Sequence, residues 1–85
     1  MSKVSIYTTP TCVYCKMTKE FFKEHNVSYE EKNVASDGEA RRQMIEKSGQ
    51  MGVPVTDIDG TIVVGFDEAR LSALLGIHEG SNITK

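Results

Sequence analysis

The sequence predicts a small α/β fold in which helices flank a four-stranded mixed sheet, in the order β-α-β-α-β-β-α. Two observations support this prediction. In the first half of the chain, β-branched and apolar runs alternate with stretches of helical periodicity, which favours a right-handed β-α-β unit with parallel strands. In the second half, two short β-branched runs flank Asp59-Gly60, a strong signal for a two-residue hairpin. That hairpin adds two antiparallel strands.

The first predicted strand and helix occupy the start of the chain. Val4–Thr8 has the apolar, β-branched composition of a strand. Val13–His25 follows it with helical periodicity, and Asn26 ends the helix. Because Met17 and Phe21 are four residues apart, we expect both side chains on the buried face of this helix.

The second predicted strand is Val27–Val34, which is rich in β-branched and aromatic residues but interrupted by charged ones. This mixture is typical of a strand near a sheet edge. We expect the pair Glu30-Glu31 to form a solvated strand face.

A capping box predicts the start of the second helix, with Ser36 as N-cap and Glu39 three residues later. The helix should run to about Ser48, since Gly49 follows as a stop signal. Its spacing turns Met44 towards the core.

The remaining elements are two strands and a short helix. Val53–Ile58 and Thr61–Val64 form the predicted hairpin. Asp67 is expected to cap a last helix over Glu68–Leu75, whose leucines form its apolar stripe.

Length and charge limit the possible function classes. The 85 residues make one small domain, predicted over residues 1–77, with residues 78–85 as a loose tail. A formal net charge of −2 and the lack of a basic face argue against nucleic-acid binding. No apolar run is long enough to cross a membrane, and the chain starts without the apolar stretch of a signal peptide. We therefore expect a cytoplasmic monomer.

Both cysteines of the chain, Cys12 and Cys15, lie where the first predicted strand is followed by the first helix. A thiol at a helix start is close to free backbone N–H groups and to the positive end of the helix dipole, which favour the thiolate. Lys16, four residues after Cys12, adds a positive charge. Because the thiolate is the nucleophile, the pair is predicted to be redox-active.

Two other interpretations of the cysteines have less support. The first is that both are small buried hydrophobic residues, which their position between strand and helix does not favour. The second is a structural zinc site, which needs four ligands. Only His25 and His78 remain as further candidates, and neither has finger-like spacing. No metal site is expected.

Three motifs, in this order, carry a resemblance to a known family. They are Thr9-Pro10-Thr11-Cys12-Val13-Tyr14-Cys15, then Gly52-Val53-Pro54, then Gly65-Phe66-Asp67. On these motifs the chain resembles a glutaredoxin over residues 3–77. The resemblance implies a thioredoxin-like fold.

The resemblance also implies a reaction and a site. The reaction is the reduction of protein disulfides or glutathione mixed disulfides by Cys12 and Cys15, with glutathione as reductant and no bound cofactor. In the family, the proline that matches Pro54 forms a cis peptide bond beside the cysteines. The residues expected to contact substrate or glutathione are Thr11, Val13, Tyr14, Val53, Pro54, Gly65, Phe66 and Asp67.

Three of these residues have a second interpretation. Tyr14 either lines the substrate groove or is a partly exposed aromatic residue on the first helical turn. Phe66 either lines the groove or fills the core. Asp67 is first of all a helix cap and secondly a contact for a ligand at the helix start.

The sequence departs from the usual family pattern at three places. Val13 replaces a frequent proline, Thr9 replaces a frequent lysine that contacts a glutathione carboxylate, and Val64-Gly65 replaces Gly-Gly. The Gly-Phe form resembles redoxins that serve ribonucleotide reductase, some of which are recharged by thioredoxin reductase. The expected partners are therefore disulfide-containing proteins, together with glutathione or a flavoprotein disulfide reductase.

The predicted mechanism uses the two thiols in turn. Cys12 attacks a disulfide to form a mixed disulfide, and Cys15 resolves it. Two other functions stay open at this stage. One is an iron–sulfur carrier that holds a [2Fe–2S] cluster between two subunits through its first cysteine and glutathione, and the other is a non-catalytic binding module.

Overall fold

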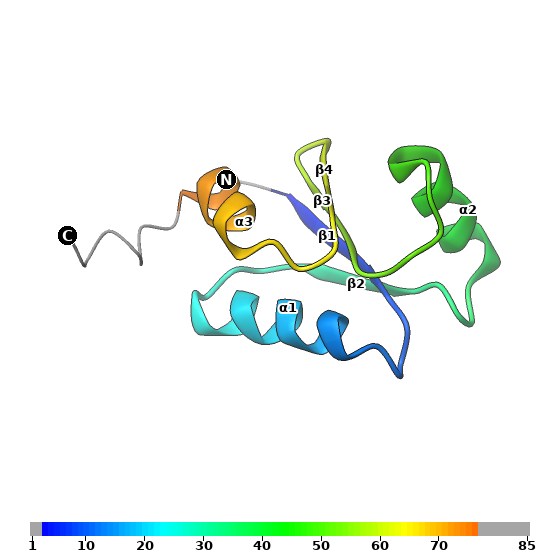
Figure 1. Cartoon of the computed structure of the whole chain (residues 1–85), viewed down its shortest axis with the longest axis horizontal. Helices are drawn as coiled ribbons and strands as arrows, with labels where there is room; N and C mark the ends of the chain where they lie inside the picture. The colour runs from blue at the N-terminus through cyan, green and yellow to red at the C-terminus, as the bar shows by residue number, and fades with distance from the viewer. Residues whose placement is uncertain (1–2, 77–85) are drawn as a thin grey trace.

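The computed structural model describes residues 3–76, which form an α/β fold in the predicted order (Figure 1). The strands are β1 (Val4–Thr8), β2 (Glu30–Asn33), β3 (Val55–Ile58) and β4 (Thr61–Val64). The helices are α1 (Val13–Glu24), α2 (Gly38–Ser48) and α3 (Glu68–Leu75). Figure 1 shows α2 and α3 at opposite ends of the molecule, with α1 running along the sheet between them.

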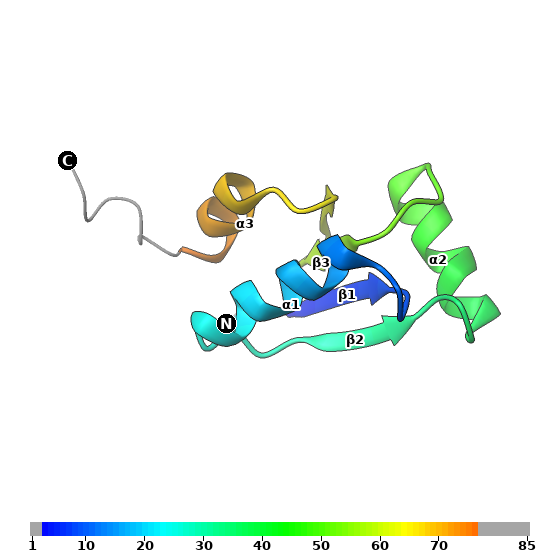
Figure 2. The same ribbon diagram turned by 60° about the horizontal axis from the view of Figure 1, so that its bottom comes forward.

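The four strands form one mixed sheet in the order β2-β1-β3-β4. β1 pairs in parallel with β2, and Figure 2 shows these two neighbouring arrows pointing the same way. β3 is antiparallel to both β1 and β4. In this register Ile6 of β1 is opposite Glu31 of β2 and Thr56 of β3. The predicted mixed sheet and edge strand are confirmed.

Each face of the sheet has its own apolar core, because successive side chains of a strand point to opposite faces. The core on the face of α1 and α3 consists of Val4, Ile6, Phe21, Phe22, Ile58, Val63 and Leu71. The core on the face of α2 consists of Tyr7, Val34, Ala40, Met44 and Val55. Residues 7 and 8 at the end of β1 therefore face different layers.

Local signals fix two of the turns. Asp59 and Gly60 both have positive φ angles, 52° and 95°, as a tight hairpin with primed geometry requires. At the end of α1, Asn26 is left-handed with a φ of 57°, and the Val27 N–H donates to the Phe22 carbonyl at 2.8 Å. This is the Schellman arrangement that closes a helix.

Two predicted boundaries change because a backbone N–H is not available for strand pairing. The second strand begins at Glu30, not Val27, because the Val27 N–H closes α1 and cannot pair with a strand. The third begins at Val55, not Val53, since Pro54 has no N–H to donate and the Val53–Pro54 peptide bond is cis.

Two helix ends also differ from the prediction. The N-cap of α2 is Asp37 and not Ser36, because the Asp37 carboxylate accepts the N–H groups of Glu39 and Ala40, each at 3.1 Å. α1 ends at Glu24, with His25 as its C-cap.

Met17 was expected in the core, and this prediction is wrong. Its side chain is 40% exposed. Cys15, Thr18, Phe21 and Phe22 form the buried side of α1, and Met17 lies at the edge of that stripe.

Within residues 3–76, no helix combines the length and apolar character needed to span a bilayer. The predicted tail, residues 78–85, lies outside the described residues.

Candidate active site

Cys12 is the N-cap of α1 and has an extended backbone, with φ −88° and ψ 116°. Its sulfur accepts a hydrogen bond from the Cys15 N–H at 3.1 Å, the bond that a serine or aspartate oxygen usually accepts at this position. The first turn of α1 contains no acidic residue. The Cys12 sulfur therefore lies at the positive end of the α1 dipole and is bonded to a backbone donor.

Cys15 has a very different environment, although both cysteines are free thiols. Only 1% of its surface is exposed, whereas Cys12 is partly exposed. Burial raises the pKa of the Cys15 thiol to about 12, and its hydrogen bond with Cys12 adds to this effect. One sulfur is thus accessible and bonded to a backbone N–H, while the other is covered and has a raised pKa.

The loop before β3 brings a second predicted motif to the cysteines. The Cys12 thiol points to the Val53 carbonyl, with 3.8 Å between sulfur and oxygen. The cis peptide bond expected between Val53 and Pro54 is present. Gly65, after β4, donates its N–H to the Pro54 carbonyl at 2.8 Å. The sequence motifs around Cys12, Pro54 and Gly65 are therefore joined by hydrogen bonds.

A shallow hollow of about 270 Å³ opens beside the accessible sulfur. Its lining residues are Pro10, Thr11, Cys12, Val13 and Lys16. Val13 and Tyr14 are exposed to 69% and 61%, respectively, although Tyr14 is not among the lining residues. The hollow can accept a substrate sulfur, and Tyr14 offers an aromatic surface on the adjoining helical turn.

Phe66 and Asp67 have structural roles in the described residues. The Phe66 ring packs edge-on against Phe21, with ring centroids 6.1 Å apart. The Asp67 carboxylate caps α3 by accepting the Arg70 N–H at 3.1 Å. The helix-cap interpretation of Asp67 is confirmed, and Phe66 packs against the core on the α1 face.

Sequence reasoning missed a polar group beneath α1. Lys19 Nζ pairs with Glu31 Oε2 at 2.9 Å, and the Thr8 hydroxyl donates to the same oxygen at 2.7 Å. Glu30 and Glu31 are both exposed, as the sequence predicted, but Glu31 also forms this ion pair. The only available signal was the spacing of four residues that puts Lys19 on the same helical face as Cys15.

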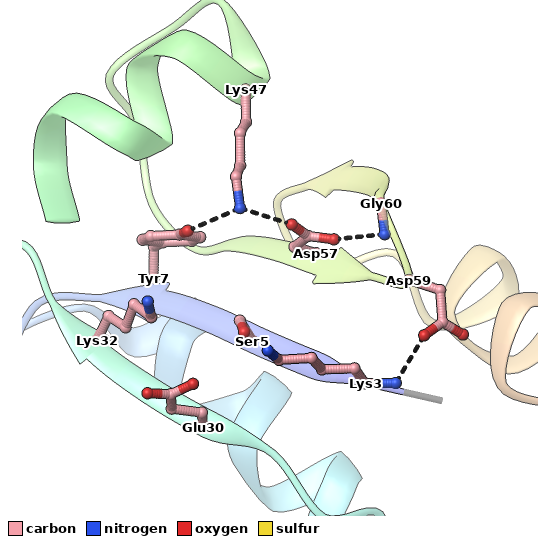
Figure 3. Close-up of a pocket in the computed structure, with 9 residues that line it drawn as sticks. All are labelled: Lys3, Ser5, Tyr7, Glu30, Lys32, Lys47, Asp57, Asp59 and Gly60. Atoms are coloured by element: carbon pink, nitrogen blue, oxygen red, sulfur yellow. Dashed lines mark hydrogen bonds and ion pairs between the residues drawn. The ribbon is translucent and has the colours of Figure 1, made fainter. Parts of the chain in front are cut away.

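A second polar group lies on the opposite face of the sheet. A hollow of about 310 Å³ there contains Tyr7, Lys47 and Asp57 (Figure 3). Lys47 Nζ contacts Asp57 Oδ2 at 2.8 Å and donates to the Tyr7 hydroxyl at 3.2 Å. The full lining is Lys3, Ser5, Tyr7, Glu30, Lys32, Lys47, Asp57, Asp59 and Gly60. This hollow contains no thiol, and its lysines and carboxylates are equal in number. We therefore assign the redox chemistry to the hollow beside Cys12.

Within residues 3–76, no three histidine, cysteine, aspartate or glutamate side chains come together in a group that could hold a metal ion.

Comparison with known proteins gives consistent matches. A family model described as Glutaredoxin matches residues 4–63. A glutaredoxin-like 8.6 kDa protein in the rubredoxin operon of Clostridium pasteurianum is 47% identical over 72 residues, covering 85% of this chain and 96% of the relative. Glutaredoxin 3 of Escherichia coli K12 is 35% identical, covering 80% and 82%. The glutaredoxin-like protein NrdH of Lactococcus lactis subsp. lactis is 31% identical, covering 84% and 97%.

Solved structures agree with the predicted thioredoxin-like fold. The thioredoxin-like protein BC3987 is 39% identical and superposes with a TM-score of 0.81, over 85% of this chain and 99% of that one. The glutaredoxin-like NrdH-redoxin of Escherichia coli, described with a thioredoxin-like activity profile, is 26% identical with a TM-score of 0.75, over 85% and 93%.

Proposed function

Since this chain belongs to the glutaredoxin family, a family of thiol–disulfide oxidoreductases, we propose that Cys12 is its nucleophile and Cys15 its resolving thiol. The observation that carries this proposal is the difference between the two sulfurs. The Cys12 sulfur is accessible and accepts a backbone hydrogen bond at the start of α1, whereas the Cys15 thiol is buried one turn further along. An attacking thiol needs access, and a resolving thiol only needs to reach its neighbour.

The reaction proceeds in two exchanges. The Cys12 thiolate attacks one sulfur of the substrate disulfide, forming a mixed disulfide and releasing the other substrate sulfur as a thiolate. Cys15 then attacks the Cys12 sulfur, and the second substrate sulfur leaves. Two electrons pass to the substrate, and the protein is left with a Cys12–Cys15 disulfide for an external reductant to reduce.

Substrates of this site are disulfides presented by an extended segment. The hollow formed with Thr11 and Val13 receives the sulfur, and the backbone of Val53, 3.8 Å from the Cys12 sulfur, lies in position to pair with a peptide. We include Tyr14 as a flanking contact because it is exposed beside the nucleophile. Glutathione mixed disulfides fit the same description.

We propose glutathione as the reductant, with a flavoprotein disulfide reductase as the second candidate. Similarity to Glutaredoxin 3 of Escherichia coli supports the first. Similarity to the NrdH proteins supports the second, because the Escherichia coli NrdH-redoxin is described with a thioredoxin-like activity profile. Either cycle suits a reducing compartment, so we place the protein in the cytoplasm.

The test is NADPH consumption with a small disulfide, measured with glutathione plus glutathione reductase and, separately, with thioredoxin reductase. We expect turnover in at least one system and none in either with Cys12→Ser. Turnover by Cys12→Ser at the wild-type rate would overturn the assignment of the nucleophile. The ratio of the two wild-type rates identifies the reductant.

A further inference from the structure

The resolving step faces an electrostatic obstacle at Cys15. A thiol must lose its proton to attack a disulfide, yet burial raises the pKa of the Cys15 thiol to about 12. In the reduced protein, the hydrogen bond and the charge of the neighbouring Cys12 sulfur raise it further, whereas the burial persists in the mixed disulfide, where Cys12 carries no charge. A backbone hydrogen bond with Thr9 and the positive charge of Lys19 act in the opposite direction. Among these contributions Lys19 is the side chain that favours the anion, and its effect is the smallest of them.

The position of Lys19 follows from the helix and from the sheet. It comes four residues after Cys15 in α1, so the two side chains lie one above the other on one face. The Glu31 carboxylate binds its ammonium group at 2.9 Å and is itself fixed by the Thr8 hydroxyl at 2.7 Å. The side chain of Lys19 is 28% exposed, so water screens its charge less than it would screen that of a free surface lysine.

We propose that Lys19, oriented by Glu31, is a positioning residue for the resolving step, in which its charge stabilises the Cys15 thiolate. The proposal rests on the proposed function, since it concerns the second exchange of that reaction. The ion pair with Glu31 fixes the Lys19 ammonium group against the sheet. Without Glu31, this group would extend into solvent.

The step balances without a further reactant. The Cys15 thiol loses its proton, and its sulfur forms a bond to the Cys12 sulfur of the mixed disulfide. The bond between Cys12 and the substrate sulfur breaks, and the substrate sulfur leaves with the electron pair and takes up a proton. Cys15 is oxidised, the substrate sulfur is reduced to a thiol, and Cys12 passes from the mixed disulfide to the Cys12–Cys15 disulfide. Lys19 keeps its own proton throughout.

Lys47 provides a matched control within the same chain. It also pairs with a carboxylate, Asp57 at 2.8 Å, and with a hydroxyl of β1, that of Tyr7 at 3.2 Å. It lies on the other face of the sheet, in a hollow without a thiol. Lys47→Met therefore removes a comparable ion pair and one positive charge at a distance from Cys15.

The experiment mixes the reduced protein with one equivalent of dithiobis(nitrobenzoate) and follows the coloured thionitrobenzoate anion. The first phase reports attack by Cys12, and the second reports its displacement by Cys15. The rates of both phases are measured against pH for wild type and for Lys19→Met, Lys19→Arg, Glu31→Gln and Lys47→Met. A urea unfolding curve for each variant separates loss of folding from loss of rate.

We expect Lys19→Met to slow the second phase by roughly three- to tenfold and to move its pH profile to higher pH, while the first phase stays unchanged. Lys19→Arg should restore most of the rate, and Glu31→Gln should lose part of it. Lys47→Met should match wild type in both phases.

A second phase of Lys19→Met that matches wild type at every pH would overturn the inference. An equal loss in Lys47→Met would also overturn it, because the effect would then not depend on position. Failure of the proposed function looks different, since wild type would lack a second phase or Cys12→Ser would keep the first. Both proposals would then be wrong.

Discussion

Two neighbouring residues of β1, Tyr7 and Thr8, belong to two similar polar groups on opposite faces of one sheet. Thr8 bonds to Glu31, which pairs with Lys19 under α1. Tyr7 accepts a hydrogen bond from Lys47, which pairs with Asp57 on the face of α2 (Figure 3). Each group combines a hydroxyl, a lysine and a carboxylate. Only the group under α1 has a cysteine one helical turn away.

On our proposal, the position of a charged pair, more than its chemistry, decides whether it contributes to the reaction. The ion-pair distances are nearly equal, 2.9 Å and 2.8 Å. The exposures are not: the carboxylate side chain is 39% exposed for Glu31 but 14% for Asp57. We therefore expect the Lys19 group to affect the rate of disulfide exchange and the Lys47 group to affect stability.

The largest expected effect comes from removing the Cys15 thiol, on which we propose that Lys19 acts. Cys15→Ser should lose nearly all reduction of a protein disulfide such as insulin, since no second thiol remains to resolve the adduct. Reduction of a glutathione mixed disulfide should persist, because glutathione can resolve it. Adding Lys19→Met to Cys15→Ser should change nothing more. A further loss of rate in the double variant would mean that Lys19 acts elsewhere than on Cys15.

The second prediction concerns the energies of the two ion pairs. Asp57→Asn should lower the free energy of unfolding by about 1–3 kcal/mol, because it weakens a charge-assisted contact to Lys47 at a mostly covered site. Glu31→Gln should cost no more than about 1 kcal/mol, since water screens the more exposed of the two carboxylates. Urea unfolding of both variants tests this order, and a larger loss for Glu31→Gln would contradict it.

How much of this arrangement the sequence predicts depends on whether the signal is local. Cys12 at a helix start and the Asp59-Gly60 hairpin depend on neighbouring residues, and both were predicted. The Lys19–Glu31 pair depends on the parallel register that places Glu31 opposite Ile6, which no short motif encodes.

Two predictions were wrong because the sequence pattern left two positions equally suitable. Met17 fits the apolar spacing of α1, but the buried side of this helix consists of Cys15, Thr18, Phe21 and Phe22, and Met17 stays 40% exposed. Ser36 and Asp37 are both good N-cap residues. Asp37 is the N-cap in the structure, and the Asn33 side chain accepts the Ser36 N–H at 3.3 Å.

The third prediction is a dependence of stability on pH. Hydrogen bonds from Lys19 and Thr8 lower the pKa of the Glu31 carboxyl from its ordinary value of 4.5. Burial acts to raise the pKa of the Asp57 carboxyl, but the hydrogen bonds from Lys47 and Gly60 outweigh it and leave the pKa below the ordinary 3.8. Both contributions are fully present above these ordinary values and are lost as pH falls through the lowered ones.

The measurement is the urea midpoint of wild type, Glu31→Gln and Asp57→Asn between neutral pH and acid. The difference between wild type and each variant should shrink on acidification, by about 1 kcal/mol or less for each carboxyl. A difference that stays constant to strongly acidic pH would show that the carboxylate charges contribute nothing to folding.

The smallest predicted effect has the opposite sign. Thr56 of β3 is fully buried on the α1 face, and its hydroxyl has no hydrogen-bond partner among the described residues. Thr56→Val replaces that hydroxyl with a methyl group of similar size, so it should stabilise the protein by up to about 1 kcal/mol. A lower melting temperature for Thr56→Val would mean that the hydroxyl is bonded in solution.

The proposed roles of Cys12 and Cys15 depend most on the inequality of the two thiols, which alkylation measures directly. The reduced protein is treated with iodoacetamide at a series of pH values, and the modified cysteines are mapped by mass spectrometry. We predict that Cys12 reacts at neutral pH, while Cys15, with 1% of its surface exposed and a pKa raised to about 12, stays unmodified until the medium is strongly alkaline. Equal modification of both thiols at neutral pH, or modification of Cys15 first, would contradict the assignment of nucleophile and resolving thiol.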